Sequence, residues 1–235
     1  MKMKLLRTIQ QSFKADNPQL IIINNKTFLS LGLALFWSVI FFVITRQVLA
    51  KETMTLDLAI SQYIYNLRTP YFDQFWRIIT DFGGIYLIFL SLIITIYLVT
   101  KRHYQQLIWF IIPLFVSLSV NIILKSLIGR SRPTISQIIT ETDFSFPSGH
   151  SSSSLVFCAM LTCLIFGITN NKIIRITSCI MASIIIVGVG LSRVYLGVHY
   201  PSDIIGGWIQ SLVILSLFWN INHFKQQKNH LFLRK

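Results

Sequence analysis

Charged residues are scarce in this chain of 235 amino acids. Asp, Glu, Lys and Arg make up 12% of the sequence, whereas hydrophobic residues make up 53%. Soluble domains average about 25% charged residues, so the composition excludes an ordinary soluble domain and indicates a membrane protein. Acids are the rarest of the charges: there are 8 Asp and Glu against 21 Lys and Arg, which leaves a net charge of +13.

A high positive charge is common in nucleic-acid-binding proteins. Here, however, the basic residues gather at the two ends of the chain and in short links between apolar runs. Membrane proteins keep their cytoplasmic Lys and Arg in such places. We therefore expect the lipid bilayer, and no nucleic acid, as a partner. The sequence carries no pattern from which a protein partner could be predicted.

Cysteine is also rare. The three cysteines, Cys158, Cys163 and Cys179, all fall within apolar runs. An odd number of thiols in such runs provides neither a disulfide framework nor a zinc-binding spacing. We expect them to be small packing residues.

Long apolar runs, in contrast, account for most of the chain. Six windows hold no charged residue and are long enough for a membrane-spanning helix, which takes about 17–25 residues. The first window begins too late and is too long for a secretory signal peptide, so we expect it to be an uncleaved span. The windows cover residues 27–45, 82–100, 104–124, 151–171, 176–192 and 204–222.

We therefore predict an all-α, polytopic membrane protein whose six transmembrane helices form one bundle. The bundle domain is expected at residues 27–222. A basic N-terminal tail at 1–26 precedes it, and a basic C-terminal tail at 223–235 follows it.

The distribution of Lys and Arg indicates the orientation of the chain. An even number of spans places both tails on one side, together with the links at 101–103 and 172–175. These segments hold most of the basic residues and one acid, Asp16. The positive-inside rule then predicts a multi-pass plasma-membrane protein with both termini in the cytoplasm. Three links face outward, at 46–81, 125–150 and 193–203.

The outward link at 46–81 is long enough to have structure of its own. Leu56, Ile60 and Ile64 recur in it at helical spacing. The pattern predicts one or two short amphipathic helices on the outer surface. A solvated loop packed on the bundle is the alternative.

Three polar segments lie at the predicted outer ends of the spans, where polar groups require a functional or pairing explanation. The first runs from Lys125 to Pro133 and includes Arg130 and Arg132. A single lysine at a span end could simply extend to the interface, but this explains three cations poorly. A guanidinium group matches phosphate oxygens, and Lys adds a point charge.

The second polar segment is Pro147-Ser148-Gly149-His150, directly before the fourth apolar window. Pro and Ser predict a helix start, whose free N–H groups and positive dipole end form an anion site. Gly149 lets the backbone approach a ligand closely. Plain N-capping by serine is the alternative, but it leaves His150, a proton donor at the mouth of this site, unexplained.

The third polar segment holds Arg193, His199 and Asp203. A carboxylate that accepts the Nδ1–H of an imidazole fixes its tautomer and leaves Nε2 free as a nucleophile. A His and an Asp four residues apart are more often a structural pair. The functional interpretation therefore depends on the conjunction of the three segments at one membrane face.

These segments resemble the motifs of the type 2 phosphatidic acid phosphatase (PAP2) superfamily of integral-membrane lipid phosphatases. The family pattern is K-x6-R-P, then P-S-G-H, then S-R-x5-H-x3-D. The chain has Lys125 with Arg132-Pro133, then residues 147–150, then Ser192-Arg193 with His199 and Asp203. Every position matches in order and spacing, and the similarity covers roughly residues 45–220.

The resemblance implies that five residues bind the substrate phosphate. Lys125, Arg132 and Arg193 would hold the phosphate oxygens. Ser148 and the backbone of Gly149 would add hydrogen bonds. Fixed cations and dipoles of this kind typically supply the largest catalytic term in phosphoryl transfer.

The resemblance also implies three catalytic residues. His199 would attack phosphorus and form a phosphohistidine, with Asp203 orienting it. His150 would protonate the leaving oxygen and then help to activate water. Because three cations supply the charge that a magnesium ion would, we expect no metal and no cofactor, and we interpret Glu141 and Asp143 as loop acids.

The resulting prediction is a phosphatase for an amphiphilic lipid phosphate or diphosphate, with its site on the extracytoplasmic face. Family substrates include phosphatidic acid, phosphatidylglycerophosphate, diacylglycerol pyrophosphate and undecaprenyl diphosphate. Phosphoryl or headgroup transfer to an alcohol is one alternative. A non-catalytic membrane protein that uses the cations as an anion site is another.

Overall fold

The computed structural model describes residues 25–134 and 136–232, with side chains at 27–134 and 136–219. All regular elements among these residues are helices. The predicted N-terminal tail lies outside them apart from the first residues of α2, whereas most of the predicted C-terminal tail continues the last helix. The helices are α2 (Asn25–Leu49), α3 (Met54–Tyr65), α4 (Pro70–Asp81), α5 (Ile85–Thr100), α6 (Tyr104–Ile128), α7 (Gly149–Ile168), α8 (Lys172–Tyr195) and α9 (Pro201–Phe232).

Six segments of the described chain are long and apolar enough to cross a membrane, which confirms the predicted number of spans. Helices α4 and α5 together count as one of them. Most of the large apolar side chains on these helices are exposed, as expected of surfaces that face lipid. The segments are Thr27–Leu49, Pro70–Thr100, Tyr104–Ile128, Gly149–Ile168, Lys172–Tyr195 and Pro201–Trp219.

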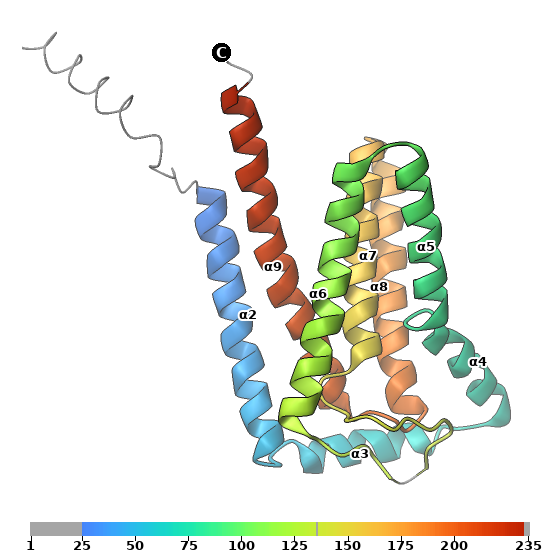
Figure 1. Cartoon of the computed structure of the whole chain (residues 1–235). Coiled ribbons are helices and arrows are strands. Elements are labelled where there is room, and N and C mark those ends of the chain that lie inside the picture. Colours follow the sequence, from blue (N-terminus) through green and yellow to red (C-terminus); the bar gives the residue numbers. More distant parts are fainter. Residues whose placement is uncertain (1–24, 135, 233–235) are drawn as a thin grey trace, which may run out of the picture.

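The helices form a bundle in which α7 packs against α6, α8 and α9, while α2 lies along α9 (Figure 1). Helix α3 lies across one end of the bundle, and we call this the site end (Figure 1). Both α3 and α4 lie within 46–81, where one or two short surface helices were expected, and they exclude an unstructured loop. Helix α4 belongs to a candidate span that begins at Pro70, earlier than the predicted start at residue 82. Thr69 caps α4, since its hydroxyl accepts a hydrogen bond from the amide of Phe72, and Pro70 occupies the first turn.

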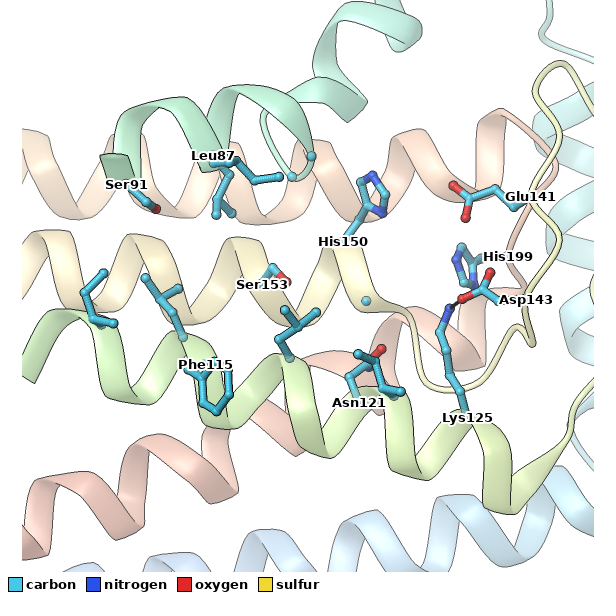
Figure 2. A pocket seen from close by; sticks show the side chains of 18 residues that line it. Leu87, Ser91, Phe115, Asn121, Lys125, Glu141, Asp143, His150, Ser153 and His199 are labelled. Carbon is cyan, nitrogen blue, oxygen red and sulfur yellow. Dashed lines mark hydrogen bonds and ion pairs between the residues drawn. The ribbon is translucent and has the colours of Figure 1, made fainter. Parts of the chain in front are cut away.

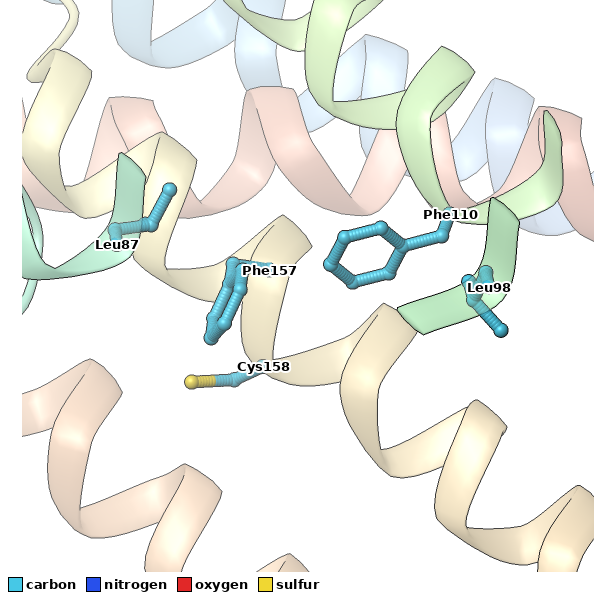
Figure 3. Packing of buried hydrophobic residues seen from close by; sticks show 5 residues of the cluster. All are labelled: Leu87, Leu98, Phe110, Phe157 and Cys158. Carbon is cyan, nitrogen blue, oxygen red and sulfur yellow. The ribbon is translucent and has the colours of Figure 1, made fainter. Parts of the chain in front are cut away.

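An apolar core holds α5, α6 and α7 together. Figure 3 shows its five most buried residues, Leu87, Leu98, Phe110, Phe157 and Cys158, between these helices. The rings of Phe110 and Phe157 meet edge to face, with centroids 5.9 Å apart. Cys158 is thus a packing residue, as predicted, whereas Cys163 and Cys179 are exposed and do not fit that prediction.

A buried polar network ties α6, α7 and α9 together behind the site. The amide of Asn121 donates to Gln210 Oε1 at 3.0 Å and to the carbonyl of Pro147 at 3.2 Å. The hydroxyl of Ser152 lies 2.8 Å from that of Ser117 and 3.0 Å from that of Ser211. Hydrogen bonds between helices inside a membrane satisfy groups that lipid cannot. The network therefore fixes α6 and α9 against the start of α7, where the site lies.

Candidate active site

The three polar segments converge at the site end of the bundle. The chain places them at the end of α6, the start of α7, the end of α8 and the start of α9. A cavity of about 520 Å³ opens among them, and Lys125, His150 and His199 all line it. Figure 2 shows these charged and titratable side chains at one end of the cavity, with apolar side chains such as Leu87 and Phe115 toward the other.

Close packing at two glycines shapes this end of the bundle. A Cβ on Gly207 of α9 would lie 2.5 Å from the carbonyl oxygen of Ser148, so only glycine lets α9 approach the start of α7 this closely. A Cβ on Gly84, at the start of α5, would lie 3.1 Å from His150 Nε2. The turn before α5 therefore forms one wall around the His150 imidazole.

The tautomer of His199 follows from its two neighbours. Arg132 Nη1 lies 3.0 Å from His199 Nε2, and a guanidinium group is only a donor. Nε2 must then accept, so the proton of the neutral ring is on Nδ1. Nδ1 lies 3.3 Å from Asp203 Oδ2, an acceptor. The sequence predicted this pairing of Nδ1 with Asp203, whereas Nε2, which was expected to be free, lies against Arg132.

The environment of His199 also keeps its ring neutral. The residue is 1% exposed. Burial, together with the positive charges of Arg193, Arg132 and Lys125, holds the pKa of His199 well below its usual value. The Nε2 of His199 is therefore unprotonated at neutral pH.

Three cations surround His199, and two carboxylates from the link between α6 and α7 contact them. Glu141 pairs with Arg193 and lies 3.2 Å from Arg132 Nη2. Asp143 pairs with both Lys125 and Arg132. The interpretation of Glu141 and Asp143 as loop acids was therefore incomplete, because they contact the cations that are predicted to bind phosphate.

Both carboxylates are ionised at neutral pH. Burial alone would raise the pKa of Glu141, but the charges of Arg193 and Arg132 outweigh it and hold the pKa below its usual value. Burial would also raise the pKa of Asp143, but hydrogen bonds from Lys125 and Arg132 outweigh it and lower the pKa to about 2. In this structure the carboxylates thus supply the negative charge that a phosphate group would bring.

Arg193 is bound by a residue of α4 as well as by Glu141 of the link between α6 and α7. Its side chain is 1% exposed, and Nη1 donates to the hydroxyl of Thr80 at 2.9 Å. Its Nε has no hydrogen-bond partner among the described residues. A buried guanidinium with a donor to spare is suited to a further oxygen acceptor, such as that of a phosphate.

Ser148 and Gly149 differ from the other predicted phosphate ligands. Ser148 is fully buried, and its hydroxyl caps α7 by accepting from the amide of Ser151 at 3.4 Å and from the Ser151 hydroxyl at 3.0 Å. This is the N-capping alternative. Gly149 lines the cavity. Phosphate binding by these two residues stays a prediction.

Sequence reasoning assigned no role to three further residues at this end. Thr80 positions Arg193, and Arg130 and Asp57 form an ion pair with 2.7 Å between Nη2 and Oδ2. The only available signals were the excess of cations between Lys125 and Pro133, and one acid inside the apolar helical pattern of residues 54–65.

A helical bundle of six spans that buries a histidine among cations, beside a cavity open to apolar surface, is the architecture of an integral-membrane phosphatase. The chain belongs to the PAP2 superfamily, whose family model matches residues 106–227. The match confirms the resemblance found in the three polar segments.

Relatives of the chain support the same family. Phosphatidylglycerophosphatase B of Bacillus subtilis is 29% identical over 183 residues, which cover 75% of this chain and 88% of that protein. An undecaprenyl-diphosphatase of Sulfolobus acidocaldarius is 41% identical over 68 residues, 29% of each chain. The crystal structure of a transmembrane PAP2-type phosphatidylglycerolphosphate phosphatase from Bacillus subtilis is similar with a TM-score of 0.75 and 27% identity, covering 81% of this chain and 96% of that one.

Proposed function

We propose that the protein hydrolyses the phosphate or diphosphate headgroup of a membrane lipid through a phosphohistidine on His199. The observation that carries this proposal is the state of His199, which lines the cavity together with Lys125 and whose unprotonated Nε2 lies beside Arg132. A neutral imidazole held by a carboxylate is a competent nucleophile. Three cations stabilise the charge that spreads over the equatorial oxygens.

The reaction proceeds in two steps. Nε2 of His199 forms a bond to phosphorus while the bond to the leaving oxygen breaks, and that oxygen takes a proton from His150, which is protonated when the negatively charged substrate binds. A water molecule, deprotonated by His150, then attacks the phosphohistidine. This step releases inorganic phosphate and restores both histidines. Asp203 stabilises the positive charge that the ring of His199 acquires in the first step.

A substrate phosphate has to take the place of the loop carboxylates. Arg132 lies against the lone pair of His199 Nε2 that would attack, and it also binds Glu141 and Asp143. A phosphate between Arg132, Arg193 and Lys125 would replace those contacts with oxygens of higher charge. The same movement would free Nε2 for in-line attack.

The shape of the cavity supports a lipid as substrate. Beyond the charged end, the cavity continues between α5 and α6 and is lined by apolar side chains that include Leu87, Ile88, Phe115 and Leu118. Phe115 and Leu118 are exposed on the outer surface of the bundle, where lipid would lie. A headgroup could thus reach His199 while its acyl or prenyl chain stays in the apolar part.

The two relatives suggest which lipids to test. Their names give phosphatidylglycerophosphate and undecaprenyl diphosphate as substrates of those proteins. Both combine a phosphate headgroup with a long apolar chain. Since the links at the other end of the bundle carry Lys101, Arg102, Lys172 and Arg175, the positive-inside rule supports an extracytoplasmic position of the site.

Purified protein in detergent is expected to release inorganic phosphate from lipid phosphates and diphosphates, and the activity is expected to persist in EDTA. Three cations of the protein supply the charge that a metal ion would otherwise provide. The measurement compares kcat/KM over a panel that contains phosphatidic acid, phosphatidylglycerophosphate, diacylglycerol pyrophosphate and undecaprenyl diphosphate, each with and without EDTA.

Three outcomes would contradict parts of this proposal. Absence of phosphate release from the whole panel would exclude the phosphatase. Loss of activity in EDTA, restored by a divalent ion, would exclude metal independence. Phosphate recovered mainly on an added alcohol would indicate a transferase.

Replacing Leu118 by tryptophan is expected to lower kcat/KM for a long-chain lipid phosphate by roughly tenfold, because the larger ring fills the apolar part of the cavity. Hydrolysis of a water-soluble short-chain phosphate should change less than about twofold. The control is Ile123→Trp, since Ile123 is an exposed residue of the same helix that does not line this cavity. Equal losses on long and short substrates would contradict the assignment of the apolar part of the cavity to the lipid chain.

A further inference from the structure

Arg130 is a partly buried cation that the phosphatase mechanism does not use. Its side chain is 8% exposed, although it stands in the link that follows α6. Nη1 donates to Asp203 Oδ1 at 2.5 Å and to the hydroxyl of Ser202 at 2.7 Å. The guanidinium carbon also lies 4.3 Å from the centroid of the Tyr200 ring. Arg130 is therefore held against the start of α9.

Asp57 of α3 completes the arrangement from the opposite side. Its Oδ2 accepts from Arg130 Nη2 at 2.7 Å and from the hydroxyl of Ser202 at 2.6 Å. Its Oδ1 accepts from the backbone amide of Ser202 at 2.9 Å, a free donor of the first turn of α9. Asp57 is 2% exposed. The surface helix α3 is thus tied to the turn that carries Asp203.

The two oxygens of Asp203 have different partners as a result. Oδ1 faces Arg130, whereas Oδ2 accepts from the amide of Tyr200 at 2.8 Å and faces His199 Nδ1 at 3.3 Å. Asp203 is fully buried, and a buried carboxylate stays charged only when it is paired and hydrogen-bonded. Arg130 is the cation that contacts it, since the contacts of Lys125, Arg132 and Arg193 go to other groups.

We propose that Arg130 and Asp57 are positioning residues that keep the Asp203 carboxylate ionised and aim its Oδ2 at His199 Nδ1. The proposal rests on the proposed function, because it concerns the same nucleophile. Arg130 reaches both carboxylates at once through the two arms of its guanidinium group. Lysine has one ammonium group and cannot make this fork.

The test uses Arg130→Ala, in which a space for a small cation is left between Asp57 and Asp203. We expect kcat to fall roughly 100-fold with KM changed less than about threefold, since substrate contacts stay in place. Guanidinium chloride at tens of millimolar should raise the kcat of this variant about tenfold, because the guanidinium ion can enter that space. Asp57→Asn should lower kcat by roughly tenfold in the same manner.

Arg68→Ala is the matched control. Arg68 also ties the surface helices to the bundle, through the carbonyls of Tyr195 and Ser136, but it does not touch Asp203. The kcat of Arg68→Ala should change less than about threefold and should not rise with guanidinium.

If Arg130→Ala does not fold, Arg130→Lys provides the comparison, since it keeps the charge without the fork and should lose roughly tenfold in kcat. A folded Arg130 variant with unchanged kcat, or a guanidinium effect shared by wild type, would overturn the proposal.

Orthovanadate separates this proposal from the phosphatase function. Vanadate adopts the five-coordinate geometry of phosphoryl transfer and needs no lipid. Wild type should bind it, and Arg130→Ala should bind it about tenfold more weakly unless guanidinium is added. A wild type that binds vanadate but hydrolyses no lipid phosphate would overturn only the phosphatase function. Equal vanadate affinity of wild type and Arg130→Ala would overturn the positioning role.

Discussion

Replacing His199 by alanine is expected to lower phosphate release by roughly 10⁴-fold or more, because it removes the group that we propose forms the covalent intermediate. The structure supports this size of effect, since Nε2 is unprotonated beside Arg132 and Nδ1 faces Asp203. The remaining cations would still bind the substrate, so KM should change little. The measurement is steady-state release of inorganic phosphate from the best substrate of the panel.

His103→Ala is the matched control for this variant. His103 is an exposed histidine in the link between α5 and α6, at the end of the bundle away from the site. Its removal should leave kcat within about twofold of wild type. Rapid-quench experiments with a ³²P-labelled substrate should also show an acid-labile phosphoprotein in wild type but not in His199→Ala. A His199→Ala protein with full activity would exclude the phosphohistidine mechanism.

His150→Ala is expected to lower kcat by roughly 10²- to 10⁴-fold on a lipid phosphate, the usual contribution of a general acid. The alkoxide that leaves from a lipid phosphate is a poor leaving group without a proton. On p-nitrophenyl phosphate, whose phenolate leaves without protonation, the loss should be at least about tenfold smaller. Comparing kcat on the two substrates isolates the proton transfer.

The alternative for His150 is that it only shapes the cavity. Gly84 lies next to its ring, so Gly84→Ala would crowd the imidazole without removing it and serves as a comparison. That variant should lose activity equally on both substrates, because it disturbs position rather than proton donation. Equal losses for His150→Ala on both substrates would contradict its role as the general acid.

Most of the fold could be predicted from local properties of the sequence. Charge-free windows predicted the six spans because a backbone in lipid must satisfy its hydrogen bonds within a helix. The apolar spacing of Leu56, Ile60 and Ile64 predicted short helices within 46–81, where α3 lies. The polar segments at Lys125, His150 and His199 predicted one site, because spans of alternating direction bring those ends together.

Other parts of the site depend on contacts between segments far apart in the chain. Glu141 and Asp143 stand in a link without regular structure, so no periodic pattern indicates where their side chains lie. The structure places them on Arg193, Arg132 and Lys125. Ser148 matched a phosphate-binding motif, yet its hydroxyl caps α7, and both uses require the same residue type at the same position.

The sequence by itself thus determined the number of spans and the family, and it predicted the chemistry of the site and the residues that carry it, since hydropathy, helix starts and motif spacing are local. Only the tertiary structure decided that Arg132 lies against Nε2 of His199, and that Arg130 joins Asp57 of α3 to Asp203 of α9. The reason is that a buried charge needs a partner, but its choice among several carboxylates depends on how the helices pack.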